Sequence, residues 1–139
     1  MNYEPVVRFY AERNSGGHVD EGDIITFTKT NLNEGDGFSK SSGTFVAPFS
    51  GVYKFEFAAM TMREQYSAEI YILKNNEQHS RIYEWNGERQ VKANEHIAHI
   101  WSMVLNQGDS VKLKMNFNGL YVSNGHHHVW FSGELLKEL

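Results

Sequence analysis

The 139-residue chain contains no cysteine and only two prolines. The missing cysteines exclude a disulfide framework and any zinc site with cysteine ligands. They do not decide the compartment, because a domain of this size can be stable outside cells without disulfides. The length suits a single domain over residues 1–139, large enough to bury its own hydrophobic core.

Clusters of basic residues and long apolar runs are also missing. The 13 Lys and Arg residues are scattered among 17 Asp and Glu residues, which argues against nucleic acid as a partner. No apolar stretch approaches the roughly 20 residues of a membrane-spanning helix, so we expect no membrane insertion. The N-terminal MNYEPVVRFY lacks the basic start and apolar run of a signal peptide. That leaves a cytosolic protein or a mature domain whose leader has been removed.

Motifs that carry catalysis do not occur either. The sequence has no cysteine nucleophile, no Gly-x-Ser-x-Gly elbow, no His-Glu-x-x-His pair and no phosphate-binding glycine loop. Histidine, aspartate and serine residues are present, but scattered residues able to form a triad are expected by chance in a chain of this length. We therefore expect a non-enzymatic protein with no obligatory cofactor.

The chain is rich in alternating apolar and polar residues. GTFVAPFSGVYKFEF places Tyr53, Phe55 and Phe57 at every second position, which predicts a strand with one aromatic face. The Pro48–Gly51 sequence before it indicates a strand end followed by a tight corner. No segment is typical of a helix, so the pattern favours an antiparallel all-β sandwich or barrel.

The remaining elements follow from the same periodicity. The turn-rich segment 31–43 is expected to be a loop with short pieces of strand. The segment 96–105, HIAHIWSMVL, is apolar on both faces, which predicts a central strand buried on two sides. Further strands are predicted at 67–74, 79–85, 110–117 and 128–136, with turns at Asn75-Asn76 and 106–109.

Eight residues between positions 27 and 57 have the spacing of a known family. They are Phe27, Asn33, Phe38, Phe45, Gly51, Tyr53, Phe55 and Phe57. This pattern resembles that of the complement C1q globular-head family, part of the wider C1q/tumour-necrosis-factor superfamily. VRFYAER, VLNQGDSVKLKM and NGLYVSNGHHHVWFSGELL are similar to the family's first strand, its Gly-Asp hairpin and its closing strand.

The resemblance implies a ten-stranded jelly-roll sandwich of two antiparallel sheets that assembles as a homotrimer. It also implies a secreted, extracellular protein, with the signal peptide absent from this sequence. One face of the strand at 96–105 would then meet the core, and the other would meet a neighbouring subunit. The residues expected at that trimer interface are His96, Ala98, Ile100 and Val104.

The function implied by the resemblance is lectin-like recognition in innate immunity, with a trimer binding glycans or other microbial or anionic patterns. The alternative is a cytokine-like ligand of a cell-surface receptor, or a metal-binding extracellular matrix or biomineralisation protein. Aromatic faces stack on sugar rings, although such residues can also be half-buried at strand ends. The candidate ligand-binding residues are Tyr66, Arg81, Trp85, Asn86, Arg89 and Tyr121.

The sequence offers two alternative candidates for a metal site. The resemblance implies calcium at one end of the threefold axis, and the best-matching acidic residues are Glu88 and Glu95, although Lys92 nearby opposes a cation. His126 and His128 could instead bind a transition metal, because alternate residues of an extended chain point to the same side. Both segments could also be ordinary polar loops. Between the two sites, we expect any metal dependence to come from calcium near Glu95, because calcium favours oxygen ligands.

Overall fold

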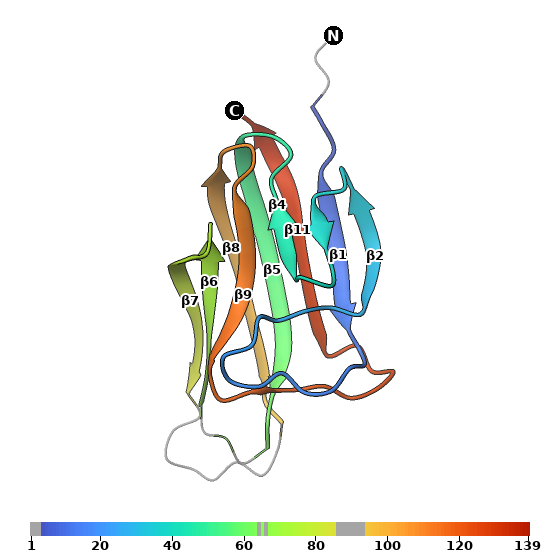
Figure 1. Cartoon of the computed structure of the whole chain (residues 1–139), viewed down its shortest axis with the longest axis vertical. Coiled ribbons are helices and arrows are strands. Elements are labelled where there is room, and N and C mark those ends of the chain that lie inside the picture. Colours follow the sequence, from blue (N-terminus) through green and yellow to red (C-terminus); the bar gives the residue numbers. More distant parts are fainter. Residues whose placement is uncertain (1–3, 64, 66, 86–93) are drawn as a thin grey trace.

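A computed structural model describes residues 4–63, 65, 67–85 and 94–139 of the chain. These residues form strands joined by turns and contain no helix (Figure 1). The strands are Arg8–Arg13 (β1), Lys29–Glu34 (β2), Phe38–Ser39 (β3), Thr44–Val46 (β4), Gly51–Thr61 (β5), Ser67–Lys74 (β6), Glu77–Trp85 (β7), His96–Leu105 (β8), Ser110–Phe117 (β9), Leu120–Tyr121 (β10) and Val129–Glu138 (β11).

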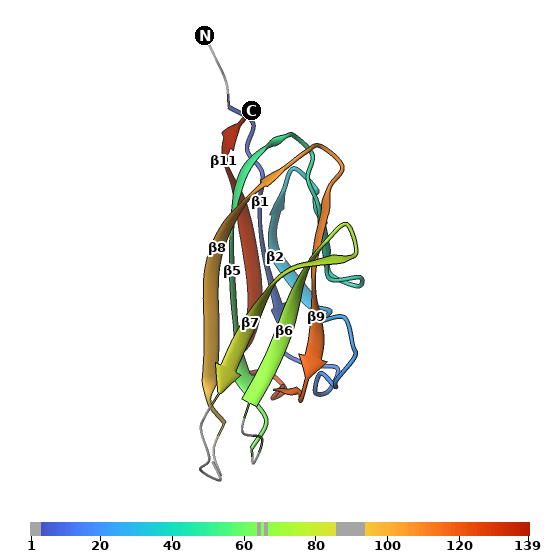
Figure 2. The same ribbon diagram turned by 90° about the vertical axis from the view of Figure 1, so that its left-hand side faces the viewer.

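Two antiparallel sheets pack face to face. In sheet A the strands follow the order β5-β11-β1-β2, and both β8 and β10 also pair with β5. Sheet B has the order β3-β4-β9-β6-β7. Figure 2 shows β8, β5 and β11 in one layer and β6 and β9 in the other. No helix long and apolar enough to cross a membrane occurs in the described part of the chain.

The core between the sheets is built from the alternating side chains of the strands. Tyr53, Phe55 and Phe57 of β5 are buried between the sheets. Lys54 and Glu56 point to the opposite side, where their charged groups lie 3.5 Å apart. The predicted aromatic stripe therefore lines the core, and the period of two assigned its direction correctly.

The predicted turns are confirmed. Asn75 and Asn76 join β6 to β7 with φ angles of 52° and 66°, the left-handed conformation that a two-residue hairpin turn requires. Residues 106–109 join β8 to β9, and the segment 31–43 contains part of β2 and all of β3. The described residues form eleven strands rather than ten when the two-residue strands β3 and β10 are counted.

The prediction that 96–105 is a central strand is wrong. Within the described chain, β8 pairs with β5 alone and so lies at an edge of sheet A. Its inward residues, such as Ile97 and Leu105, are buried, but the outward Ile100 and Val104 are exposed. Two apolar faces suggested burial on both sides, yet the fold of one chain covers only one of them.

Candidate functional site

Exposed aromatic side chains lie on the outer face of β7, which ends the strand order of sheet B. Tyr83 and Trp85 are 53% and 62% exposed, and their positions two residues apart place them on one side of the strand. Arg81 precedes them on the same side, with its guanidinium carbon 5.5 Å from the centroid of the Tyr83 ring. Arg81, Tyr83 and Trp85 together form what we call the β7 surface.

Glu69 of the adjacent strand β6 holds Arg81 in place. Its carboxylate accepts a hydrogen bond of 2.8 Å from Arg81 Nη1 and another of 2.7 Å from Asn116 Nδ2. Glu69 is only 7% exposed, and a buried carboxylate is stable only with such partners. The Arg81 side chain itself remains mostly exposed, so its guanidinium is oriented but still accessible.

Two of the six predicted ligand-binding residues, Arg81 and Trp85, come together on the β7 surface. Sequence reasoning missed Tyr83, although its place between them in RIYEW was a usable signal. It also missed Glu69, whose role depends on the pairing of β6 with β7.

Other predicted ligand-binding residues lie elsewhere. Tyr121 belongs to β10 in sheet A, where its ring stacks on His18 with centroids 5.1 Å apart. It does not join the β7 surface. Tyr66, Asn86 and Arg89 lie outside the described residues.

The outward face of β8 contains all four residues predicted at a trimer interface. His96, Ala98, Ile100 and Val104 are each exposed and alternate with inward residues. Ile100 and Val104 are 62% and 56% exposed, which is unusual for large aliphatic side chains. In a single chain, β8 therefore presents an uncovered apolar ridge.

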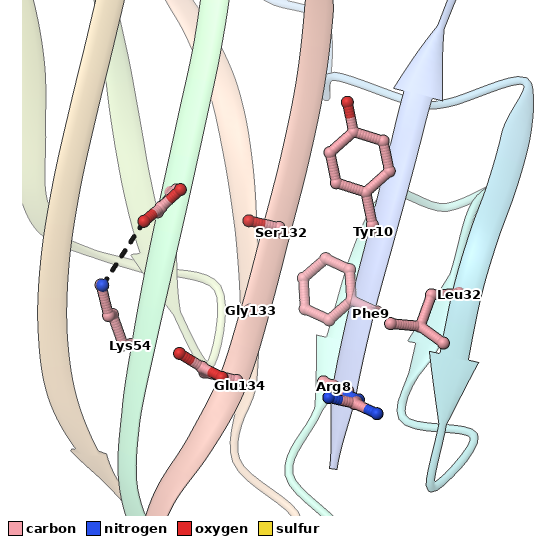
Figure 3. A pocket seen from close by; sticks show the side chains of 9 residues that line it. Arg8, Phe9, Tyr10, Leu32, Lys54, Ser132, Gly133 and Glu134 are labelled. Atoms are coloured by element: carbon pink, nitrogen blue, oxygen red, sulfur yellow. Dashed lines mark ion pairs between the residues drawn. The ribbon is translucent and has the colours of Figure 1, made fainter.

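A hollow of about 240 Å³ opens on the same outward face, between β1, β2, β5 and β11 (Figure 3). Tyr10 and Leu32 contribute apolar surface to the hollow, and Lys54 and Glu56 of β5 also line it. The outward face of sheet A therefore combines an apolar edge strand with a hollow of mixed polarity.

The predicted histidine site follows a tight turn. The backbone N–H of His126 donates to the carbonyl of Ser123 at 3.2 Å. Gly125 occupies this turn with a φ of 76°, a conformation that favours glycine. The Ser123 hydroxyl also lies 2.7 Å from His126 Nδ1, which fixes the orientation of that ring.

The three adjacent histidines are arranged as an extended chain predicts. The rings of His126 and His128 lie next to each other, with centroids 5.5 Å apart and an interplanar angle of 66°. His127 instead donates from Nδ1 to the buried carboxylate of Glu12. His126 and His128 therefore lie together, as expected for alternate residues of an extended chain, while His127 is exposed and paired with Glu12. Metal binding by this pair stays a prediction.

The surroundings of Glu12 and His128 shift the pKa values of both side chains. Burial raises the pKa of the Glu12 carboxyl, but hydrogen bonds from His127 and Asn31 outweigh burial, so its pKa is lowered overall. Burial also lowers the pKa of His128, and electrostatic interactions with His126, His96 and His127 lower it further. At neutral pH, Glu12 is therefore ionised and His128 is neutral.

The expected calcium site is only partly described. Glu95 exchanges hydrogen bonds with Thr61, whose backbone N–H donates to the Glu95 carbonyl at 2.8 Å. Glu88 lies outside the described residues. Among the residues that are described, no group of three or more His, Asp or Glu side chains could hold a metal ion. Calcium at Glu95 therefore stays a prediction.

The two sheets and their connections define a jelly-roll sandwich. The chain belongs to the C1q family: the model of the C1q domain matches residues 8–136. It is 29% identical over 131 residues to complement C1q tumor necrosis factor-related protein 3 of Homo sapiens, covering 93% of this chain and 48% of the relative. The Mus musculus protein of that name gives the same values. The chain thus spans about half the length of these relatives.

Solved structures support the same fold. The globular domain of zebrafish complement 1qA superposes with a TM-score of 0.77 at 18% identity, covering 96% of this chain and 99% of that one. Eiger TNF from S. frugiperda gives a TM-score of 0.79 at 9% identity, with 98% and 96% covered. At these sequence identities the structural similarity establishes the fold of this chain but does not identify a ligand.

Proposed function

We propose that this protein is a non-enzymatic extracellular recognition module that forms a homotrimer and binds glycans or other anionic microbial patterns through its β7 surface. The observation that supports this proposal is the exposure of Tyr83 and Trp85 beside the oriented Arg81. An aromatic face stacks on the apolar face of a sugar ring. A guanidinium donates to carboxylate, sulfate or phosphate groups, so the three residues suit an acidic saccharide.

The proposed trimer uses the outward face of sheet A. The apolar ridge of β8 in one subunit would pack against the hollow beside Tyr10 and Leu32 in the next subunit. The two surfaces are different, so the contact is heterologous, and three copies close it into a ring. The β7 surface belongs to the other sheet and stays accessible, and three weak sites on one body raise avidity for a repetitive surface.

The test is binding of the purified protein to a glycan array and to immobilised lipopolysaccharide. We expect Trp85→Ala and Arg81→Ala each to weaken binding at least about tenfold, a loss of about 1.4 kcal/mol. Free acidic saccharide should compete with the immobilised glycan for binding to the wild-type protein. Thermal unfolding of each variant checks that the fold is retained.

A matched control is Phe49→Ala. Phe49 is 38% exposed in the connection between β4 and β5, at the end of the sandwich opposite the end of β7 (Figure 1). Its removal should leave glycan binding unchanged. Binding to cells that no saccharide inhibits, and that Trp85→Ala does not alter, would reject the lectin proposal in favour of the receptor-ligand alternative.

Calcium near Glu95 is a secondary part of the proposal, supported by the carboxylate's place at the start of β8, where copies of sheet A would converge. If the folded trimer holds calcium, adding the ion raises the melting temperature and chelator reverses the rise. Glu95→Gln should remove this response. A melting temperature insensitive to calcium would end the calcium part without affecting the glycan test.

A further inference from the structure

We propose that His126 and His128 form a binding site for a divalent transition-metal ion such as zinc, copper(II) or nickel(II). The two imidazoles are adjacent in space, and the His126 ring is oriented by the Ser123 hydroxyl. This site is separate from the β7 surface and does not depend on the proposed function.

The separation of the two rings matches that of two ligands on one metal. A zinc–nitrogen bond of about 2.1 Å places the centroid of an imidazole ring about 3.2 Å from the metal. Two such rings at a tetrahedral angle have centroids about 5.2 Å apart. The observed centroid separation of His126 and His128 is 5.5 Å, which is close to this value.

Neighbouring contacts orient the His126 ring and hold His127 away from it. The Ser123 hydroxyl lies at hydrogen-bond distance from Nδ1 of His126, which leaves Nε2 as the ligating atom. His127 is anchored to Glu12, and Glu12 also accepts a 2.7 Å hydrogen bond from Asn31 Nδ2. Because His127 is fixed on one side of the segment, its two neighbours are directed to the other side. A preorganised pair loses less conformational entropy when it binds.

The donor chemistry selects the class of metal. Imidazole nitrogen suits zinc, copper and nickel, whereas calcium takes six to eight oxygen ligands. No third His, Asp or Glu side chain in the described chain completes a three-ligand group, so water fills the remaining coordination positions. The site is therefore open, and its affinity comes from two nitrogen ligands.

The experiment is calorimetric titration of the full chain, stripped of metal with a chelator, with zinc chloride at neutral pH. We expect one zinc ion per chain. His126→Ala and His128→Ala should each weaken zinc binding at least about tenfold, because each removes one of two protein ligands. Retention on nickel-charged resin should fall in the same two variants, and excess calcium should not displace zinc.

The matched control is His79→Ala. His79 is an exposed histidine of β7 whose Nδ1 lies 3.3 Å from the Ser80 hydroxyl, so it resembles His126 but has no adjacent imidazole partner. Its loss should change zinc affinity less than twofold. Equal zinc affinity in the unchanged protein and the two variants, or no zinc binding at all, would overturn the proposal.

Discussion

The family spacing between positions 27 and 57 has a physical reason at each polar or small residue. The Asn33 side chain accepts from the Phe38 N–H and donates to the Phe38 carbonyl, which closes the connection between β2 and β3. The Tyr53 hydroxyl donates to the carbonyl of Phe49 at 2.7 Å and so secures the corner before β5. A Cβ atom at Gly51 would lie 2.5 Å from a backbone oxygen of β11, so only glycine fits there.

The loss of the Phe55 side chain should cost much of the stability of the fold. It is fully buried, and its ring centroid lies within 6.4 Å of those of five other aromatic residues, one on β5 itself and four on other strands. We expect Phe55→Ala to lower the free energy of unfolding by about 3–5 kcal/mol, the usual cost of an emptied aromatic site. Denaturant titration at fixed protein concentration measures this change.

The control for this variant is Phe49→Ala, which removes a partly exposed ring but keeps the carbonyl that Tyr53 needs. It should cost less than about 1 kcal/mol. An unchanged free energy of unfolding in Phe55→Ala would mean that the β5 stripe does not face the core, in conflict with the sandwich.

At the scale of elements, strands and hairpin turns were largely predictable because a period of two and asparagine or glycine turns are local signals. The position of β8 in its sheet was not predictable from its own residues. A strand face that is buried within one chain has the same apolar residues as a strand face that only another subunit would bury. The strand order, which is a property of the whole chain, decides between them.

The same distinction applies to the candidate sites. Trp85 and Arg81 could be identified from the sequence because an aromatic residue next to a predicted loop and a basic residue on the same strand are typical of a binding surface. Glu69 could not, since its burial and its contact with Arg81 exist only after β6 and β7 pair. The proximity of His126 and His128 was predictable from spacing, but the anchoring of His127 by Glu12 required the distant strand β1.

Asp109 should make the hairpin between β8 and β9 sensitive to acid. Its pKa is lowered, first by a hydrogen bond from the Asn75 side chain, then by the Asn106 backbone N–H, and also by the charge of Lys74. The Asn75 and Asn106 donors lie 3.0 Å and 2.8 Å from its carboxylate oxygens. Because the pKa is lower in the folded than in the unfolded state, ionised Asp109 stabilises the fold above about pH 4. This stabilisation is lost as the pH falls through the folded-state pKa.

We therefore expect Asp109→Asn to cost about 1–2 kcal/mol near pH 7, a value typical of hydrogen bonds to a charged group. The difference from the unchanged protein should shrink as the pH is lowered from 6 to 3 in urea titrations. Asp36→Asn, at an exposed aspartate between β2 and β3, should show no such difference at any pH. A cost of Asp109→Asn that is constant across this range would show that charge plays no part.

At the scale of the whole molecule, the two sheets present different outward surfaces. The outward face of sheet A carries an apolar ridge and a hollow, and a monomer would leave both in water. Sheet B carries the aromatic and charged β7 surface, with its ion pair between Arg81 and Glu69 already formed. Apolar area is stabilised by burial, and an oriented polar surface remains functional when exposed. This asymmetry is the structural reason to expect self-association through sheet A and ligand binding through sheet B.

The homotrimer is tested by light scattering coupled to gel filtration, where we expect a mass three times the 16.0 kDa of one chain. Val104→Lys and Ile100→Lys should each dissociate it, because a charge buried without a partner costs about 3–5 kcal/mol. The matched control is Val46→Lys on β4 of sheet B, where the valine is also exposed, at 44% against 56% for Val104. This control should remain trimeric and fully folded. A monomeric mass for the unchanged protein at micromolar concentration would reject the trimer, and dissociation by Val46→Lys but not by Val104→Lys would move the interface to sheet B. In that second case the interface would lie on sheet B, the sheet that carries the β7 surface, and the exposure of that surface in a single chain could no longer by itself support glycan binding.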